Sequence, residues 1–243
     1  MKKTKTDNIN NIHAWTLFEI LFLSICLAVV VGCFVFSSDR NYFSLTTSLI
    51  GVVAVLTVSK GLVWAPYVNV VFNTCYAILA FTQGFYGEFI ISVVLMNAIY
   101  IMSIVSWVRN KGKQNDKVVQ INKISKMEYT VLVIATLVVT VLFYFILKAL
   151  NTRELVVGTL SLVGSGVAAY LMFRRCSNYA LGYIFNDIVL ILMWSLNIVT
   201  NGWGYLPTVI SFVVFLLNDI YGFIHWKKEE KSQIDFDNNI DTK

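Results

Sequence analysis

The sequence alternates between long apolar runs and short polar segments. Eight of the runs are close to the length that an α-helix needs to cross a bilayer, about 20 residues. They cover about residues 14–36, 43–59, 62–83, 88–108, 128–148, 154–173, 179–200 and 204–226. The pattern predicts an all-α polytopic membrane protein with eight transmembrane helices and short loops between most of them.

Composition supports a membrane protein and excludes several other classes. Hydrophobic residues make up 57% of the chain and charged residues 14%, against about 25% charged residues in soluble domains. No alternating pattern of about ten residues suggests a membrane β-barrel. The sequence shows no metal-ligand cluster, nucleophile constellation, phosphate-binding glycine loop or interleaving of basic and aromatic residues. We therefore expect no enzyme, no cofactor and no nucleic-acid partner.

The positive charges support the count of eight spans. If the N-terminus is cytoplasmic, sixteen of the nineteen Lys and Arg residues fall on the cytoplasmic side, and only Arg40, Lys148 and Arg153 fall outside. This is the distribution that the positive-inside rule requires. We predict a multi-pass protein of the bacterial cytoplasmic membrane with both termini in the cytoplasm. Glu19, near the cytoplasmic start of the first span, is expected to reach the lipid headgroups.

One alternative concerns the first span. The stretch Val30-Val31-Gly32-Cys33 is loosely similar to a lipoprotein cleavage site, and Lys2 and Lys3 precede it as a basic segment. Cleavage there would leave seven spans and an external N-terminus. The apolar run before Cys33 is long for a signal peptide, so we favour eight spans.

The chain also contains an internal repeat. A shift of 113 residues aligns Ser48–Gly51 with Ser161–Gly164 and Phe72-Asn73 with Phe185-Asn186, and a shift of 119 then aligns Trp107 with Trp226. Chance similarity between apolar segments is the alternative. An odd number of linking spans makes the repeats parallel, as in some carriers. The predicted organisation is an N-terminal tail and extra helix (1–42), a first three-helix repeat (43–109), a cytoplasmic loop and linking helix (110–152), a second three-helix repeat (153–228) and a cytoplasmic tail (229–243).

Polar residues within the spans are the candidates for a substrate site, because such groups face the protein interior or a cavity. Asn73 and Asn186 occupy equivalent repeat positions, and each could equally hold the helix bundle together by a hydrogen bond. Asp187 and Asp219 have no Lys or Arg within any span to pair with. They could bind substrate, carry a coupling proton, or be protonated and purely structural. Asn218-Asp219 aligns with Ile99-Tyr100 in the first repeat, and this asymmetry favours a substrate role.

Several short motifs together resemble the PnuC vitamin transporter family. They are Phe72-Asn73, the Tyr86-Gly87-Glu88 sequence before the fourth span, the closing Trp107 followed by basic residues, and Asn218-Asp219-x-Tyr221-Gly222 ending at Trp226-Lys227. The resemblance runs from about Ser44 to Lys228. It implies a fold like that of full-length SWEET carriers, with the 3 + 1 + 3 repeat found above.

The resemblance further implies a function. Members take up nucleoside-like vitamin precursors, above all nicotinamide riboside, by facilitated diffusion, and a cytoplasmic kinase traps the product by phosphorylation. Substrate binds in the middle of the bundle through Asn and aromatic residues. The predicted substrate-binding residues here combine these positions with the polar residues found above, and they are Asn73, Tyr100, Asn186, Asp187, Trp194, Asn218 and Asp219.

Two departures from the family pattern leave the substrate open. Nicotinamide riboside carriers have a Trp-x-x-Trp pair on the helix matching 179–200, where this chain has Leu190 and Met193, with Trp194 beside them. A glutamine expected early in 88–108 is Ser92 here. A deoxynucleoside or thiamine carrier is therefore the alternative within the family, and a non-transporting receptor or scaffold is the alternative outside it. A homo-oligomer is left open.

Overall fold

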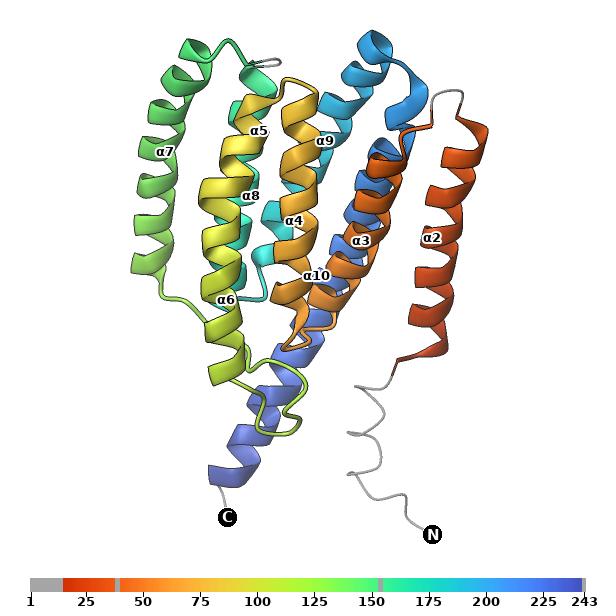
Figure 1. Cartoon of the computed structure of the whole chain (residues 1–243). Coiled ribbons are helices and arrows are strands. Elements are labelled where there is room, and N and C mark those ends of the chain that lie inside the picture. Colours follow the sequence, from red (N-terminus) through yellow and green to blue (C-terminus); the bar gives the residue numbers. More distant parts are fainter. Residues whose placement is uncertain (1–14, 38–39, 153–154, 242–243) are drawn as a thin grey trace.

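The computed structural model describes residues 15–37, 40–152 and 155–241, and their regular elements are helices (Figure 1). Eight helical stretches in these ranges are long and apolar enough to cross a membrane, which confirms the predicted all-α class and the eight spans. Lys2, Lys3, Lys5, Arg153 and Lys243, which entered the charge argument, lie outside the described residues. The helices are α2 (Leu17–Phe36), α3 (Tyr42–Ser59), α4 (Ala65–Thr82), α5 (Tyr86–Ile90), α6 (Asn97–Arg109), α7 (Lys126–Ala149), α8 (Leu155–Phe173), α9 (Tyr179–Asn201) and α10 (Leu206–Asp241).

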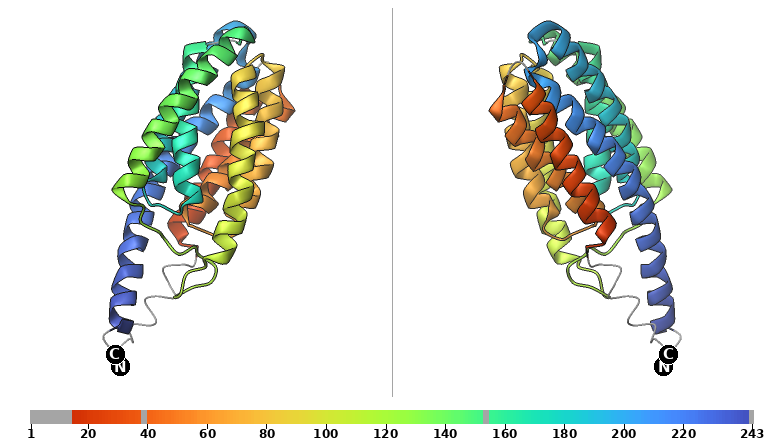
Figure 2. Two further views of the ribbon diagram at one scale, coloured as in Figure 1. Left: turned by 90° about the vertical axis from the view of Figure 1, so that its left-hand side faces the viewer. Right: turned by 90° about the vertical axis from the view of Figure 1, so that its right-hand side faces the viewer.

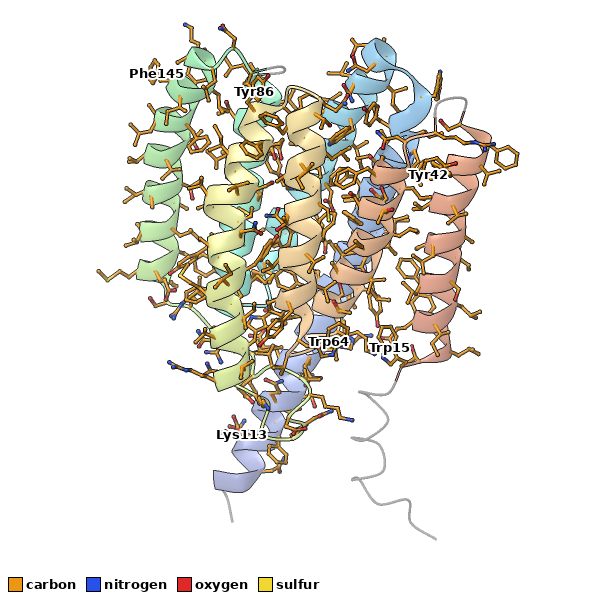
Figure 3. All side chains as sticks on the ribbon, viewed as in Figure 1. Trp15, Tyr42, Trp64, Tyr86, Lys113 and Phe145 are labelled. Atoms are coloured by element: carbon orange, nitrogen blue, oxygen red, sulfur yellow. The ribbon has the colours of Figure 1, made fainter. Side chains whose placement is uncertain are left out.

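Two short elements complete the spans. The π-helical segment η1 (Ile91–Met96) joins α5 to α6 in one continuous span, Tyr86–Arg109, and the 3₁₀ turn η2 (Trp203–Tyr205) precedes α10. Exposed aromatic side chains mark both ends of the bundle. Figure 3 places Tyr42 and Tyr86 near one end and Trp15 and Trp64 toward the other. Aromatic residues gather at the two bilayer interfaces in this way.

The first repeat consists of α3, α4 and α5–α6, and the second of α8, α9 and α10. Across the interface between the repeats, α10 packs on α3 and α6 packs on α8. The indole of Trp107, near the end of α6, donates a hydrogen bond of 3.0 Å to the Met172 carbonyl on α8. The indole of Trp226 on α10 donates one of 3.0 Å to the Val58 carbonyl on α3. Each repeat therefore fastens its third helix to the first helix of the other, as expected for an approximate two-fold arrangement.

A glycine at the same place in each repeat allows the first two helices of that repeat to pack closely. A Cβ on Gly51 of α3 would lie 2.7 Å from the ring of Phe72 on α4. A Cβ on Gly164 of α8 would lie 2.8 Å from the ring of Phe185 on α9. Phe72 and Phe185 are a pair that the sequence alignment of the repeats matches. The internal repeat is therefore present in the packing as well as in the sequence.

The helices α2 and α7, at opposite edges of the bundle in Figure 1, begin in the same way. Thr16 caps α2 and Ser125 caps α7, and each hydroxyl accepts a hydrogen bond from the backbone of a glutamate three residues on, Glu19 or Glu128. Glu19 then pairs with Lys60 in the turn after α3, and Glu128 pairs with Arg174 in the turn after α8. The N-terminal helix is thus related to the linking helix, and each repeat is preceded by one such helix.

Glu19 corrects one expectation. It does not reach toward the headgroups but is 1% exposed, and its carboxylate lies 2.6 Å from Lys60 Nζ, which is 3% exposed. The hydroxyl of Tyr221 on α10 donates a further hydrogen bond of 2.8 Å to Glu19. A buried ion pair with an added hydrogen bond therefore fixes α2 to α3 and α10.

In Figures 1 and 2, α10 projects beyond the other helices at one end of the bundle, and most of the described basic residues belong to segments at this end. Twelve of the described Lys and Arg residues belong to the connections and helix ends there, and Arg40 and Lys148 lie at the other end. Here α10 continues well beyond Trp226 as a helix instead of ending near it. The side chain of Gln233 on this extension accepts a hydrogen bond of 2.8 Å from Ile121 N and donates one of 3.2 Å to Val119 O. These contacts dock loop 110–125 on α10, and we call this end of the bundle the basic end.

Candidate functional site

A cavity lies in the middle of the bundle, between the two repeats. Helices from both repeats line it, and most of the lining side chains are apolar or aromatic with a few polar groups among them. This is the usual composition of a small-molecule site. The lining residues are Val55, Val58, Asn69, Phe72, Asn73, Tyr76, Glu88, Ile91, Ser92, Met96, Tyr100, Ser165, Tyr183, Asn186, Asp187, Leu190, Phe212, Phe215 and Asp219.

Five of the seven predicted site residues line this cavity: Asn73, Tyr100, Asn186, Asp187 and Asp219. Two of them, Asn73 and Asn186, are fixed by hydrogen bonds to residues of their own repeat. Asn73 Nδ2 donates hydrogen bonds to the Ser92 carbonyl (2.7 Å) in η1 and to Asn97 Oδ1 (2.9 Å). Asn186 Oδ1 accepts one of 2.9 Å from the Ser161 hydroxyl on α8. These bonds fix the orientation of both amides at the cavity wall.

The π-helical segment η1 forms part of the wall and contains Ser92, where the family pattern leads one to expect a glutamine. In a π-helix the backbone hydrogen bonds are shifted by one residue, which is why such segments often occur at functional sites. The side chain of Asn73 bonds to the carbonyl of Ser92 in this segment. The irregular helix and Asn73, which has an equivalent in Asn186 of the second repeat, therefore meet at one point of the cavity.

Asp187 and Asp219 lie close to each other on α9 and α10, and both face the cavity. Two neighbouring carboxyl groups with no cation beside them are most stable when one of them carries a proton. Asp187 Oδ2 is buried and has no hydrogen-bond partner. No Lys or Arg is among the described residues that line the cavity. The pair thus offers the cavity both a donor and unused acceptors.

Two tyrosines, one from each repeat, line the cavity with their hydroxyl groups close together. The hydroxyls of Tyr100 on α6 and Tyr183 on α9 lie 3.1 Å apart. Tyr100 aligns with Asp219 in the repeat, so equivalent positions of the two halves both face the cavity. The sequence identified Tyr100 as a candidate and missed Tyr183.

Glu88 is a third acidic residue at the cavity, and the sequence analysis did not select it. Its side chain is 4% exposed, and Oε1 has no hydrogen-bond partner. The Tyr76 hydroxyl donates a long hydrogen bond of 3.4 Å to Oε2. Glu88 lies in the first turn of its span, where a carboxylate is easily read as part of the loop. The absence of any nearby Lys or Arg in the sequence was the available signal.

Trp194 does not line the cavity but covers it on the side away from the basic end. Its indole donates a hydrogen bond of 3.2 Å to the Tyr76 hydroxyl, and its ring packs on Phe85 and Tyr205. Just beyond, the amide of Gln83 is bonded to both Tyr205 and Asn197. This buried aromatic and polar cluster closes one end of the site.

The basic end of the cavity is closed by a second aromatic cluster. The ring centroids of Trp107 and Trp226 are 5.7 Å apart, and Tyr179 packs on Trp226 at 4.8 Å. All three side chains are almost fully buried. Because the two tryptophans also hold the repeats together, opening this end requires the repeats to separate there.

Asn218 also lies outside the cavity lining. It is 1% exposed, and its Nδ2 donates a hydrogen bond of 2.7 Å to the Ser59 hydroxyl on α3. The neighbouring Asp219 faces the cavity instead. The structure therefore separates the two halves of the polar pair, and a substrate contact by Asn218 remains a prediction that this placement does not support.

Two repeats around a central cavity, with a buried aromatic cluster at each end, form an arrangement that is typical of membrane transporters. The chain belongs to the nicotinamide mononucleotide transporter family, which matches residues 41–228. This confirms the resemblance to PnuC proteins, and it makes the chain a membrane transporter and not an enzyme. No group of three or more His, Cys, Asp or Glu residues that could hold a metal ion occurs within the described ranges.

Two curated relatives and one solved structure are similar over most of the chain. The nicotinamide riboside transporter PnuC of Neisseria mucosa is 24% identical over 217 residues, which cover 88% of this chain and 82% of the relative. The protein of the same name from Haemophilus influenzae is 22% identical over 219 residues, covering 89% and 92%. The crystal structure of the vitamin B3 transporter PnuC has a TM-score of 0.80 at 24% identity, covering 90% of this chain and 94% of that one.

Proposed function

We propose that the protein takes up a nucleoside-like vitamin precursor of the nicotinamide riboside class across the bacterial cytoplasmic membrane. The observation that carries the proposal is the central cavity, in which buried acceptors without partners face a set of aromatic rings. The names of the relatives support nicotinamide riboside in particular. The excess of Lys and Arg at the basic end supports a cytoplasmic position for that end.

The chemistry of the lining suits a sugar attached to a planar ring. Sugar hydroxyls both donate and accept hydrogen bonds, and the Asp187–Asp219 pair can do both. Asn73 and Asn186 add amides with fixed orientations. Phe72, Tyr76, Phe212 and Phe215 offer ring faces and edges for a flat heterocycle.

A simple carrier mechanism is consistent with the site. Rocking of the two repeats would open the Trp194 cluster and the Trp107–Trp226 cluster in turn, which gives the substrate access from one side at a time. We propose that transport is facilitated diffusion and that phosphorylation by a cytoplasmic kinase retains the product. Since each cluster joins groups from both repeats, a relative movement of the repeats is sufficient to open either one.

A second candidate within the family rests on Leu190. This residue lines the cavity at a position where nicotinamide riboside carriers are expected to have an aromatic side chain. Loss of that ring would weaken the preference for nicotinamide. Thiamine or a neutral deoxynucleoside is therefore the alternative substrate.

A flux assay tests the proposal. Purified protein in liposomes is expected to equilibrate labelled nicotinamide riboside across the membrane and to accumulate it no further, with or without a pH gradient. Thiamine and thymidine, assayed in parallel, separate the alternatives. Absence of flux for all three compounds would contradict a carrier function, and accumulation driven by a pH gradient would contradict facilitated diffusion.

A further inference from the structure

We propose that Glu88 is the residue that selects a positively charged ring, and that it does so separately from the Asp187–Asp219 pair, which binds the sugar. The inference rests on the proposed function and assigns roles within the same cavity. Its starting point is the difference in surroundings between the acidic groups. Asp187 and Asp219 lie next to each other, whereas Glu88 has no neighbouring carboxyl group among the described residues.

The hydrogen bonds around Glu88 hold it as an acceptor. Trp194 donates to the Tyr76 hydroxyl, and that hydroxyl donates to Glu88 Oε2. The Ser161 hydroxyl lies near Glu88, but its single proton is directed to Asn186 Oδ1. Glu88 Oε1 is therefore left buried and without a donor. A carboxylate in this position gains most from a positive charge placed in the cavity.

Aromatic rings surround the place where such a charge would lie. Tyr76, which bonds to Glu88, packs against Phe72 at 6.0 Å and against Phe212 at 5.7 Å between ring centroids. Phe215 continues the cluster from Phe72 at 5.5 Å. A cation is attracted by aromatic faces as well as by a carboxylate. Glu88 and these rings together suit a flat cationic heterocycle such as the pyridinium of nicotinamide riboside.

The sugar-binding groups lie at a different level of the bundle. Phe212 packs on Tyr76, and Asp219 is seven residues further along the same helix toward the basic end. Seven residues correspond to about 10 Å along an α-helix. The cavity thus has a carboxylate with aromatic rings nearer one end and a carboxyl pair with two tyrosine hydroxyls nearer the other. A nucleoside with a cationic ring can engage both.

The test compares two ligands that differ in ring charge. Nicotinamide riboside has a cationic ring, and its dihydro form has a neutral ring of nearly the same shape. For the wild-type protein we expect tighter binding of the cationic form in calorimetry. For Glu88→Gln, which keeps the size of the side chain, we expect at least about a tenfold loss of affinity for the cationic form. The ratio of the two affinities should fall by the same factor.

Asp219→Asn serves as the matched control, because it removes a carboxyl group from the same cavity at the sugar level. It should weaken both ligands alike and leave their ratio near the wild-type value. Retained binding of the dihydro form also shows that Glu88→Gln is folded. An unchanged ratio in Glu88→Gln, whether both affinities fall or neither does, overturns the assignment while leaving the proposed function intact. Failure of the wild-type protein to bind nicotinamide riboside overturns the proposed function and this inference with it.

Discussion

Asp187→Ala is expected to lower the affinity for the transported nucleoside by about a hundredfold or more. Asp187 Oδ2 is buried at the cavity without a hydrogen-bond partner, and Asp219 lies beside Asp187. Hydrogen bonds to a charged or strongly polar acceptor contribute about 1.5–3 kcal/mol each, and a sugar diol can make two of them. Loss of both would account for this decrease, since about 1.4 kcal/mol corresponds to a factor of ten. Binding is measured by calorimetry on purified protein.

Asn218→Ala is the control for Asp187→Ala. Asn218 is equally buried and lies next to Asp219, but it contacts Ser59 and not the cavity. It should lower the stability of the protein and change the affinity by no more than a few-fold. Asp187→Asn, which preserves the shape of the side chain, shows whether Asp187→Ala acts only through a packing defect. A full loss of affinity in Asn218→Ala with normal affinity in Asp187→Ala would place the binding site elsewhere.

Lys60→Met is expected to cost about 3–5 kcal/mol of unfolding free energy, because it leaves Glu19 charged and buried without its counter-ion. Both partners are nearly inaccessible to solvent, and they join α2 to the turn after α3. A loss of this size should lower the melting temperature by on the order of 6 °C or more in a chain of this length. Thermal unfolding of the purified protein in detergent measures the effect. Adding Glu19→Gln to Lys60→Met should recover part of it, because the uncompensated charge is then removed.

The pair between Arg174 and Glu128 provides the comparison. It occupies the equivalent place in the second repeat at a distance of 2.6 Å, but its side chains are 38% and 22% exposed. Exposed pairs contribute at most about 1 kcal/mol, so Arg174→Met should shift the melting temperature much less than Lys60→Met. Equal shifts for the two variants would mean that burial does not govern the strength of these pairs.

Much of the fold could be predicted because each membrane span is encoded locally. An apolar run of sufficient length specifies a transmembrane helix without reference to the rest of the chain. The internal repeat was also visible in the sequence, because Gly51 and Phe72 recur as Gly164 and Phe185 at the same spacing. Each glycine leaves room for the phenylalanine of the neighbouring helix, so the packing depends on both residues. The extension of α10 was not visible, because residues after Trp226 are polar and their helix is held by distant groups such as Ile121.

The candidate site was predicted in part, because polar residues within an apolar span can also be recognised locally in the sequence. Asn73, Tyr100, Asn186, Asp187 and Asp219 are polar residues at membrane depth, and such residues must find a cavity or a partner. Spacing along one helix does not show which neighbouring helix a side chain meets. Trp194 and Asn218 share helices with cavity residues but turn to other partners, Tyr76 and Ser59.

Contacts between residues far apart in the chain were the least predictable. Glu19 and Lys60 are 41 residues apart, and nothing in the sequence around either one indicates the other. The reciprocal hydrogen bonds of Trp107 and Trp226 link the repeats across more than 60 residues. The sequence showed that both tryptophans close a repeat, and only the three-dimensional arrangement showed that they fasten the repeats to each other.

A structure determined with nicotinamide riboside bound will show whether the substrate binds in the cavity between the two repeats. We expect density for one molecule there, with its sugar next to Asp187 and Asp219 and its ring next to Glu88 and Tyr76. Density for the ligand at any other place, with the central cavity empty under conditions where transport is measured, would contradict substrate binding between the repeats.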